Sequence, residues 1–341
     1  MSSRQAHMRF RISIILLLLC ASLVCFSGNG RAEDIDENLI QSAEQGDADA
    51  QYSLGNIYFR GQGVSVDYEA AKEWYQKAAE QGHIGAQGAL VYMYIKGLGV
   101  SHNFSEAIKW TKKGAAKGHP EAQYYLGGLY QNGLGTPVDY EAAMKWYQKA
   151  ATQGHLAAQY MLGGMYYEGL GIPVDYEKAM IWIQKAAAQG LANAQFVLAE
   201  IYYRGKGVAV NYEEAMQWLR KAAIQGMANA QAVLGSMYEQ GKGTPVDLDN
   251  AFKWYQMSAG QGHPGAQYSL GKMYDTGRGV PENDIKSYAW LSLSASQGTE
   301  RANEYLENLT DSMTPEQIAE AKKEAARLLE WFKDSRGQGV K

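Results

Sequence analysis

A glycine recurs at a fixed 36-residue spacing through most of the chain, with no insertion between copies. The glycines are Gly46, Gly82, Gly118, Gly154, Gly190, Gly226, Gly262 and Gly298. A fixed period of this length is typical of stacked supersecondary units that share one continuous core. The 341 residues are therefore predicted to form one repeat array rather than two unrelated domains.

Each period is predicted to contain two helices. In the first period, Ala50, Leu54 and Tyr58 fall on one face of a helix. Glycine at position 61 ends that helix, because glycine adopts a positive φ without strain. Asp67 then begins the second helix, since its side chain caps free backbone N–H groups. Later periods hold only Asp or Asn in this slot: Asn103, Asp139, Asp175, Asn211, Asp247 and Asn283.

Large aromatic residues also recur at fixed slots. The second helix carries Trp74, Trp110, Trp146, Trp182, Trp218, Trp254 and Trp290, and the first helix carries Tyr58, Tyr94, Tyr130, Tyr166, Tyr202, Tyr238 and Tyr274. We expect these rings to fill the space left by the Ala and Gly positions. On that interpretation Trp146→Ala would cost about 3–5 kcal/mol of stability.

The repeat pattern A-x-x-x-L-G-x-x-Y-x-x-G-x-G-V, then D-Y-x-x-A-x-x-W-x-x-x-A-A-x-x-G, resembles the Sel-one-like repeat family, a relative of the tetratricopeptide repeat. One copy is carried by Ala122, Leu126, Gly127, Tyr130, Gly133, Gly135, Asp139, Tyr140, Ala143, Trp146, Ala150, Ala151 and Gly154. The match covers residues 46–298. Departures are local: Val91 and Ala199 replace the Gly after Leu, and Gly114 and Ser287 replace an Ala.

The resemblance implies an all-α fold: a right-handed α/α superhelical solenoid of seven 36-residue helix-pair repeats with capping helices at both ends. It also implies protein–protein interaction. Bacterial members of the family are often secreted or periplasmic adaptors. Cysteine-rich relatives have been linked to β-lactam binding, but their paired cysteines are missing from residues 33–341 of this chain.

The organisation predicted from the sequence has five parts. Residues 1–32 form a signal peptide, 33–46 an N-terminal cap helix, 47–298 the seven repeats, 299–335 the C-terminal capping helices, and 336–341 a flexible tail. Thr314 and Gln317 flank a first-turn proline and are spaced as in a capping box. The apolar face of the helix that follows, from Ile318 to Phe332, is expected to close the open end of the array.

The N-terminal 32 residues resemble a signal peptide, with arginines before an apolar run from Ile12 to Phe26. Small residues at Gly30 and Ala32 predict cleavage after Ala32. We therefore expect a periplasmic or secreted protein with no membrane association after cleavage. The alternative is a retained anchor and a membrane-tethered assembly factor.

Composition limits the chemistry that residues 33–341 can carry. Both cysteines, Cys20 and Cys25, lie in the N-terminal segment. Disulfides, a cysteine nucleophile and thiolate zinc sites are thus excluded from the exported chain. That segment also holds four arginines and no acidic residue, which leaves 28 basic and 36 acidic side chains and a net charge of −8. An acidic chain of this kind disfavours nucleic acid as a partner.

The predicted binding surface is the concave face lined by the first helices, because these residues vary between repeats while the core slots do not. The predicted contact residues are Tyr124, Gln131, Tyr160, Tyr167, Asn193, Phe196, Tyr203 and Arg204. Aromatic residues and arginine are the usual energetic anchors of protein interfaces. We expect the partner to be a protein or peptide; the alternative is that these rings pack against neighbouring repeats.

No catalytic residue, metal site or cofactor site is predicted. His83, His119, His155 and His263 share one slot, but Leu191 and Met227 occupy it elsewhere, so junction packing is favoured over metal binding. The Gly-x-Gly turns follow helices and lack the lysine of a phosphate-binding loop. The remaining alternative is a cell-wall-associated or β-lactam-binding enzyme.

Overall fold

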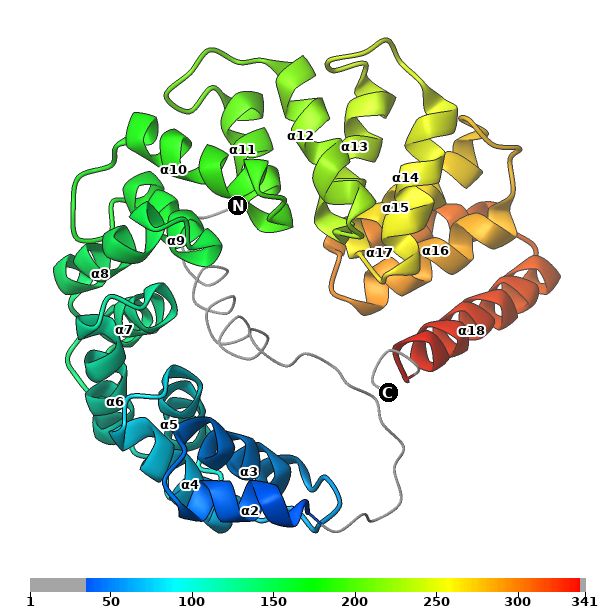
Figure 1. The fold of residues 1–341 in the computed structure, drawn as a ribbon. Coiled ribbons are helices and arrows are strands. Elements are labelled where there is room, and N and C mark those ends of the chain that lie inside the picture. The colour runs from blue at the N-terminus through cyan, green and yellow to red at the C-terminus, as the bar shows by residue number, and fades with distance from the viewer. Residues whose placement is uncertain (1–34, 338–341) are drawn as a thin grey trace. The chain divides into compact units, whose positions relative to one another are not determined.

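The computed structural model describes residues 35–337, with side chains described as far as Glu330. Over that range the secondary structure consists of 17 helices and no strand (Figure 1). The chain divides into two compact units, residues 1–175 and 176–341. The predicted signal peptide, the cleavage after Ala32 and the last four residues of the predicted tail lie outside the described residues.

The described part of the first unit runs from the N-terminal cap to the first helix of the fourth repeat. Its helices are α2 (Glu37–Glu44), α3 (Ala48–Arg60), α4 (Tyr68–Glu80), α5 (Ile84–Lys96), α6 (Phe104–Ala116), α7 (Pro120–Asn132), α8 (Tyr140–Thr152) and α9 (Leu156–Glu168). Each helix packs on the next along the chain. Within this unit α5, α7 and α9 lie on the inner side of its curve, and α4, α6 and α8 on the outer side (Figure 1).

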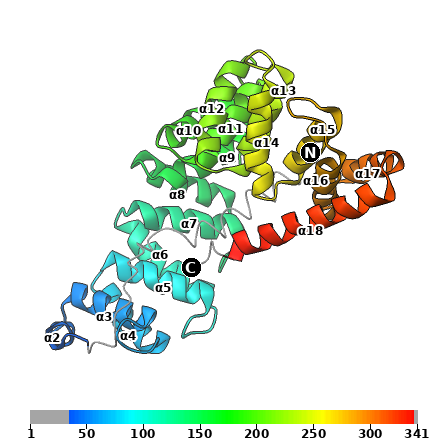
Figure 2. The ribbon, with the colours of Figure 1, turned by 90° about the vertical axis from the view of Figure 1, so that its right-hand side faces the viewer.

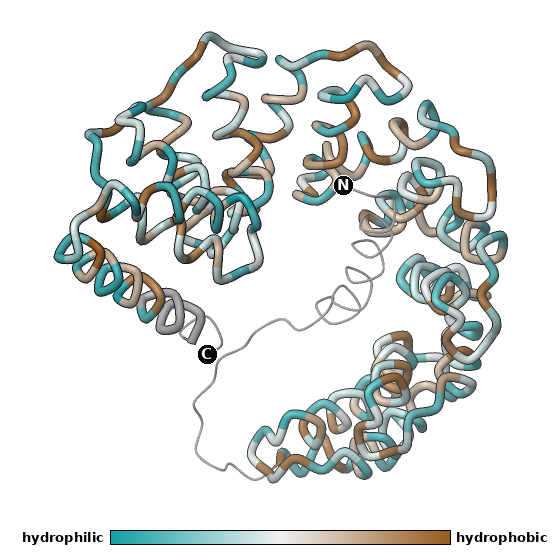
Figure 3. The backbone as a smooth tube through the Cα atoms, turned by 180° about the vertical axis from the view of Figure 1, so that it is seen from behind, coloured by the Kyte–Doolittle hydropathy of each residue, from teal (hydrophilic) through white to brown (hydrophobic). Residues whose placement is uncertain are grey.

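The second unit continues the same order of helices and ends in the C-terminal cap. Its helices are α10 (Tyr176–Ala188), α11 (Ala192–Arg204), α12 (Tyr212–Ile224), α13 (Ala228–Gln240), α14 (Leu248–Gly260), α15 (Pro264–Thr276), α16 (Asp284–Ser296), α17 (Glu300–Ser312) and α18 (Pro315–Gly337). Sequential packing of helix pairs is the arrangement of an all-α solenoid, as the sequence predicts. Apolar segments recur along the helices of the array (Figure 3).

The turn inside each repeat is fixed by local backbone chemistry. Gly61 ends α3 with φ 68°, and the Asp67 side chain accepts a hydrogen bond from the Ala70 N–H at 2.9 Å. The Asp67 N–H donates to the carbonyl of Tyr58 at 2.9 Å, and the same bond recurs in later repeats. These three features confirm the predicted glycine stops and Asp or Asn caps.

The second glycine of each turn from the second repeat onward lets consecutive repeats approach closely. Gly135 has φ 73°, and a Cβ atom there would lie 2.7 Å from the backbone of Phe104. A Cβ atom built on Gly171 or Gly207 would likewise lie 2.5 Å from the corresponding residue, Tyr140 or Tyr176. A side chain at these positions would therefore push neighbouring repeats apart.

The prediction that the tryptophans fill the core is wrong in detail. Trp146 is half-buried, and the Lys149 ammonium lies 4.2 Å from its ring centroid. The fully buried slot is one residue later, where Tyr147 is 0 % exposed and its ring packs against Gly127. Five tryptophans have a lysine three residues later over the ring: Trp74, Trp110, Trp146, Trp182 and Trp218. Six of the seven repeat tryptophans are half-buried, whereas Trp110 is 4 % exposed and belongs to the core of the first unit. The prediction therefore holds for Trp110, and the other rings form a partly buried row with lysines over several of them.

Buried glutamines on the first helices join consecutive repeats, and the sequence analysis did not predict them. The Gln51 amide donates to the Ala43 carbonyl at 3.0 Å and accepts from Gln81 at 2.8 Å. Gln123 accepts in the same way from Gln153, also at 2.8 Å. In the second repeat Lys117 occupies the donor slot, and the buried oxygen of Gln87 has no hydrogen-bond partner.

We predict that Lys117→Gln raises the free energy of unfolding by about 1 kcal/mol, because it gives the Gln87 oxygen the amide partner it lacks. The measurement is urea denaturation of residues 33–341. The matched reverse change, Gln153→Lys, removes the partner of Gln123 and should cost a similar amount. If the two substitutions changed the free energy of unfolding equally and in the same direction, this account of the glutamine contacts would be contradicted.

The last helix of the C-terminal cap, α18, begins with the predicted capping box. The Gln317 N–H donates to the Thr314 hydroxyl at 3.2 Å, and the Thr314 N–H donates to the Gln317 side chain at 2.8 Å. Helix α18 packs on α16 (Figure 2), with Ala321 fully buried. Further along, Ala325 and Leu328 are half-buried and Leu329 is 44 % exposed, so the predicted apolar face is only partly covered there.

Candidate functional site

The structure places the eight predicted contact residues on α7, α9 and α11. Three of them are not open to a partner: Tyr124 is 4 %, Gln131 5 % and Tyr160 7 % exposed. Tyr167, Asn193, Phe196 and Tyr203 are half-buried, and Arg204 is exposed. The four residues up to Tyr167 belong to the first unit, and the other four belong to the second.

Tyr124 packs between repeats, which was the stated alternative to a binding role. Its ring stacks on His155 with centroids 4.8 Å apart and lies 5.8 Å from the ring of Tyr147. Burial, followed by the charge of Glu121, raises the pKa of the Tyr124 hydroxyl above its ordinary range. Gln131 is also structural, because its side-chain oxygen accepts the Tyr147 hydroxyl hydrogen bond at 2.8 Å.

The α11 residues combine packing with surface charge. Phe196 packs against the buried core of the second unit. The Tyr203 hydroxyl accepts a hydrogen bond from the Lys242 ammonium at 2.7 Å, and its ring meets Tyr212 edge to face at 5.2 Å. The guanidinium of Arg204 pairs with Glu200 at 2.9 Å. Tyr203 and Arg204 therefore stand beside charges that a partner can reach.

The histidine slot packs repeat junctions, as predicted. His155 Nδ1 accepts a hydrogen bond from the Ala158 N–H at 3.1 Å and so caps α9. Its Nε2 lies 2.7 Å from a carboxylate oxygen of Glu121. This hydrogen bond is the largest of the effects that lower the pKa of Glu121. His83 repeats both contacts, with Ala86 at 3.1 Å and with Asp49 at 3.1 Å.

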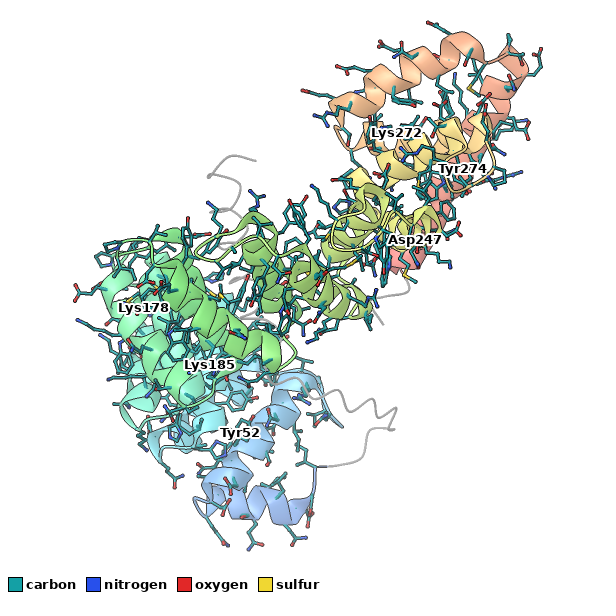
Figure 4. All side chains as sticks on the ribbon, turned by 90° about the horizontal axis from the view of Figure 1, so that it is seen from above. Tyr52, Lys178, Lys185, Asp247, Lys272 and Tyr274 are labelled. Atoms are coloured by element: carbon teal, nitrogen blue, oxygen red, sulfur yellow. The ribbon has the colours of Figure 1, made fainter. Side chains whose placement is uncertain are left out.

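The surface open on the first helices differs from the predicted one. We define the first-helix face, within each unit separately, as the exposed side chains of that unit's first helices. They include Ser53 and Arg60 in the first unit, and Arg204, Gln240 and Thr276 in the second. Lys272 of α15 lies on a first helix as well (Figure 4). Arg204 holds the position equivalent to Arg60 and was already among the predicted contact residues, because this position changes from one repeat to the next.

Across residues 35–330, no group of three or more His, Cys, Asp and Glu side chains is placed to hold a metal ion. No helix in the described part of the chain combines the length and the apolar character needed to cross a membrane.

The model of the Sel1 repeat matches seven consecutive segments: 48–83, 86–119, 120–155, 156–191, 192–227, 228–263 and 264–299. The chain belongs to the Sel1 repeat family. Proteins of this family are generally protein-interaction scaffolds, and their fold is typically non-enzymatic. A comparison with curated proteins finds no match.

Two solved structures show the same fold at appreciable sequence identity. A Sel1 repeat protein from Oxalobacter formigenes is 32% identical with a TM-score of 0.59, over 87% of this chain and 93% of that one. The protective antigen c5321 of uropathogenic Escherichia coli, which displays an SLR fold, is 31% identical with a TM-score of 0.54, over 89% of this chain and 73% of that one.

Proposed function

We propose that this protein is an exported, non-catalytic scaffold that binds a protein or peptide through the first-helix face. The contrast between core and surface slots carries this proposal. The core slot of the first helix is always leucine, and it is at most 1 % exposed: Leu54, Leu90, Leu126, Leu162, Leu198, Leu234 and Leu270. The last residue of the same helix varies in charge and size: it is exposed as Arg60, Arg204, Gln240 and Thr276, and half-buried as Lys96, Asn132 and Glu168. Repeats that share one core and differ on one surface can read different parts of a partner.

The export part of the proposal rests on the N-terminal sequence. Its arginines, its apolar run and the small residues at Gly30 and Ala32 are those of a cleaved signal. A relative described as a protective antigen supports export, because such an antigen has to meet the host immune system. N-terminal sequencing of the exported protein should begin at Glu33. A protein that retains residues 1–32 would instead be the membrane-tethered form.

The binding part is tested by affinity capture with residues 33–341, followed by mass spectrometry. Arg204→Glu with Gln240→Glu changes the first-helix face by three negative charges. Gln217→Glu with Lys253→Glu makes the same charge change at exposed positions of second helices. We expect the first pair to lose the partner and the second to keep it, with equal melting temperatures. Capture that only the second pair abolishes would contradict the proposal.

A further inference from the structure

Two repeats of the first unit share a contact made by three side chains at the junction with the next repeat. In the first repeat, Tyr52 (Figure 4) stacks on His83 with ring centroids 4.4 Å apart, and His83 Nε2 lies 3.1 Å from Asp49. In the third repeat, Tyr124 stacks on His155 at 4.8 Å, and His155 Nε2 lies 2.7 Å from Glu121. We call this trio of acid, ring and histidine the junction set.

The second repeat retains only the histidine of the junction set. His119 begins α7 at the position that His83 and His155 hold in their helices, but its side chain makes no capping hydrogen bond. Gly85 stands in the acid position and Gly88 in the ring position. Gly88 is exposed, and a Cβ atom built there would meet no atom within 4 Å. The ring position of this repeat is therefore open to solvent, and Tyr52 borders the neighbouring Gly85.

The charge of the second repeat adds an independent observation. Residues 84–119 contain five lysines and one acidic residue, in a chain whose net charge is −4. Lys96, Lys109, Lys112, Lys113 and Lys117 are the lysines, and Glu106 is the acid. Only Lys96 shares α5 with Gly88, and Lys109, Lys112 and Lys113 are on α6. The charge can therefore steer an acidic partner toward the second repeat, but it does not line the open position itself.

We propose that Gly88 and His119 form a recognition subsite for an acidic–aromatic helix of the protein partner. The occupant carries a carboxylate and an aromatic ring three residues apart, as Asp49 and Tyr52 do on α3. Its ring stacks on the His119 imidazole over Gly88, and its carboxylate accepts a hydrogen bond from the imidazole N–H. This inference rests on the proposed scaffold function and specifies the chemistry of its ligand.

The contacts of His83 and His155 show which hydrogen bonds a ring in this slot can make. In His83 and His155, Nδ1 accepts a backbone N–H bond, so the ring proton is on Nε2 and is donated to the carboxylate. A neutral imidazole therefore offers a ring face for stacking and one N–H donor for an acid. Aromatic stacking contributes specificity beyond simple burial of apolar area.

The test uses residues 33–341 with ¹³C-labelled histidine and a capped helical peptide containing one Glu-Ala-Ala-Tyr motif. We expect a saturable shift of the His119 ring signals. Replacing the peptide tyrosine by alanine should weaken binding by about tenfold, as for an interface anchor. Replacing the peptide glutamate by glutamine should weaken it as well. Saturation without a shift at His119, or with equal affinity for the alanine peptide, would overturn the inference.

Two variants of Gly88 separate occupation of the subsite from damage to the fold. Gly88→Tyr supplies the missing ring from the protein itself, so it should fold and lose the peptide. Gly88→Ala leaves the ring position open, so it should retain peptide binding and be slightly more stable, because alanine favours a helix. Equal peptide binding by all three proteins would overturn the inference.

The same variants distinguish this subsite from the wider scaffold function. If a cellular partner is captured through the first-helix face and Gly88→Tyr does not reduce its capture, the subsite is overturned and the proposed function stands. Loss of that partner in Gly88→Tyr, with Gly88→Ala unchanged, would support both. Peptide binding at His119 without face-dependent capture would support the subsite and contradict the wider function.

Discussion

Tyr147→Ala is expected to lower the free energy of unfolding by about 3–5 kcal/mol, the cost of emptying a large buried aromatic site. Tyr147 is 0 % exposed, and its ring occupies the space that the absent side chain of Gly127 leaves. Its hydroxyl donates to the buried oxygen of Gln131 at 2.8 Å. The substitution therefore opens a cavity and also leaves a buried acceptor without its donor.

Trp146→Ala is the matched control, one residue away on the same helix. Because Trp146 is half-buried and stacked by Lys149, its removal should cost about 1–2 kcal/mol, less than a fully buried aromatic residue. Urea denaturation followed by circular dichroism measures both variants, with hydrogen exchange to detect local opening of the third repeat. A larger loss of unfolding free energy in Trp146→Ala than in Tyr147→Ala would show that Trp146, and not Tyr147, is the core residue.

Gly135→Ala is the second large effect we expect, at about 2–5 kcal/mol. Two penalties combine at this position. Alanine would be strained at φ 73°, which costs about 1–2 kcal/mol. Its Cβ atom would also lie 2.7 Å from the backbone of Phe104, and such overpacking adds about 1–3 kcal/mol. The substitution should loosen the junction between the second and third repeats.

Gly154→Ala separates the two penalties. Gly154 has φ 90°, but a Cβ atom there meets nothing within 4 Å. Only the backbone strain applies, so this variant should lose about 1–2 kcal/mol. Thermal melts of both variants provide the comparison. Equal losses at the two positions would show that close approach of the repeats does not contribute at Gly135.

Local signals allowed most of the fold to be predicted from the sequence. Gly61 marks a helix end and Asp67 a helix start because both act through their own backbone, whatever packs around them. The capping box of Thr314 and Gln317 is local in the same way. Repetition strengthened these signals, since each slot was seen seven times.

The order of burial within a helix could not be predicted in the same way. Trp146 and Tyr147 are adjacent, so both lie near the same apolar stripe, and only the position of Gly127 on the facing helix decides which ring enters the core. Four of the half-buried tryptophans have a lysine three residues later, but so does the buried Trp110, and Trp254 and Trp290 are half-buried without one. That spacing therefore does not predict which rings are partly exposed.

The predicted contact residues were only partly suitable for the same reason. Tyr124 was placed on an open surface, but contact with His155 depends on how two repeats meet. The buried glutamine pairs, such as Gln123 with Gln153 in the third repeat, are also formed by residues 30 positions apart. The open position at Gly88, by contrast, can be found by aligning the repeats, because its neighbours in the same slot are Tyr52 and Tyr124.

Site-specific photo-crosslinking in the living cell tests the central claim, that this chain binds its partner through the first-helix face. Benzoylphenylalanine is placed at Ser53 and Gln240 on first helices, and at Glu73 and Gln217 on second helices, all exposed. We predict one shared adduct from the first-helix positions and little or none from the second-helix positions. Adducts formed mainly at Glu73 and Gln217 would contradict the account.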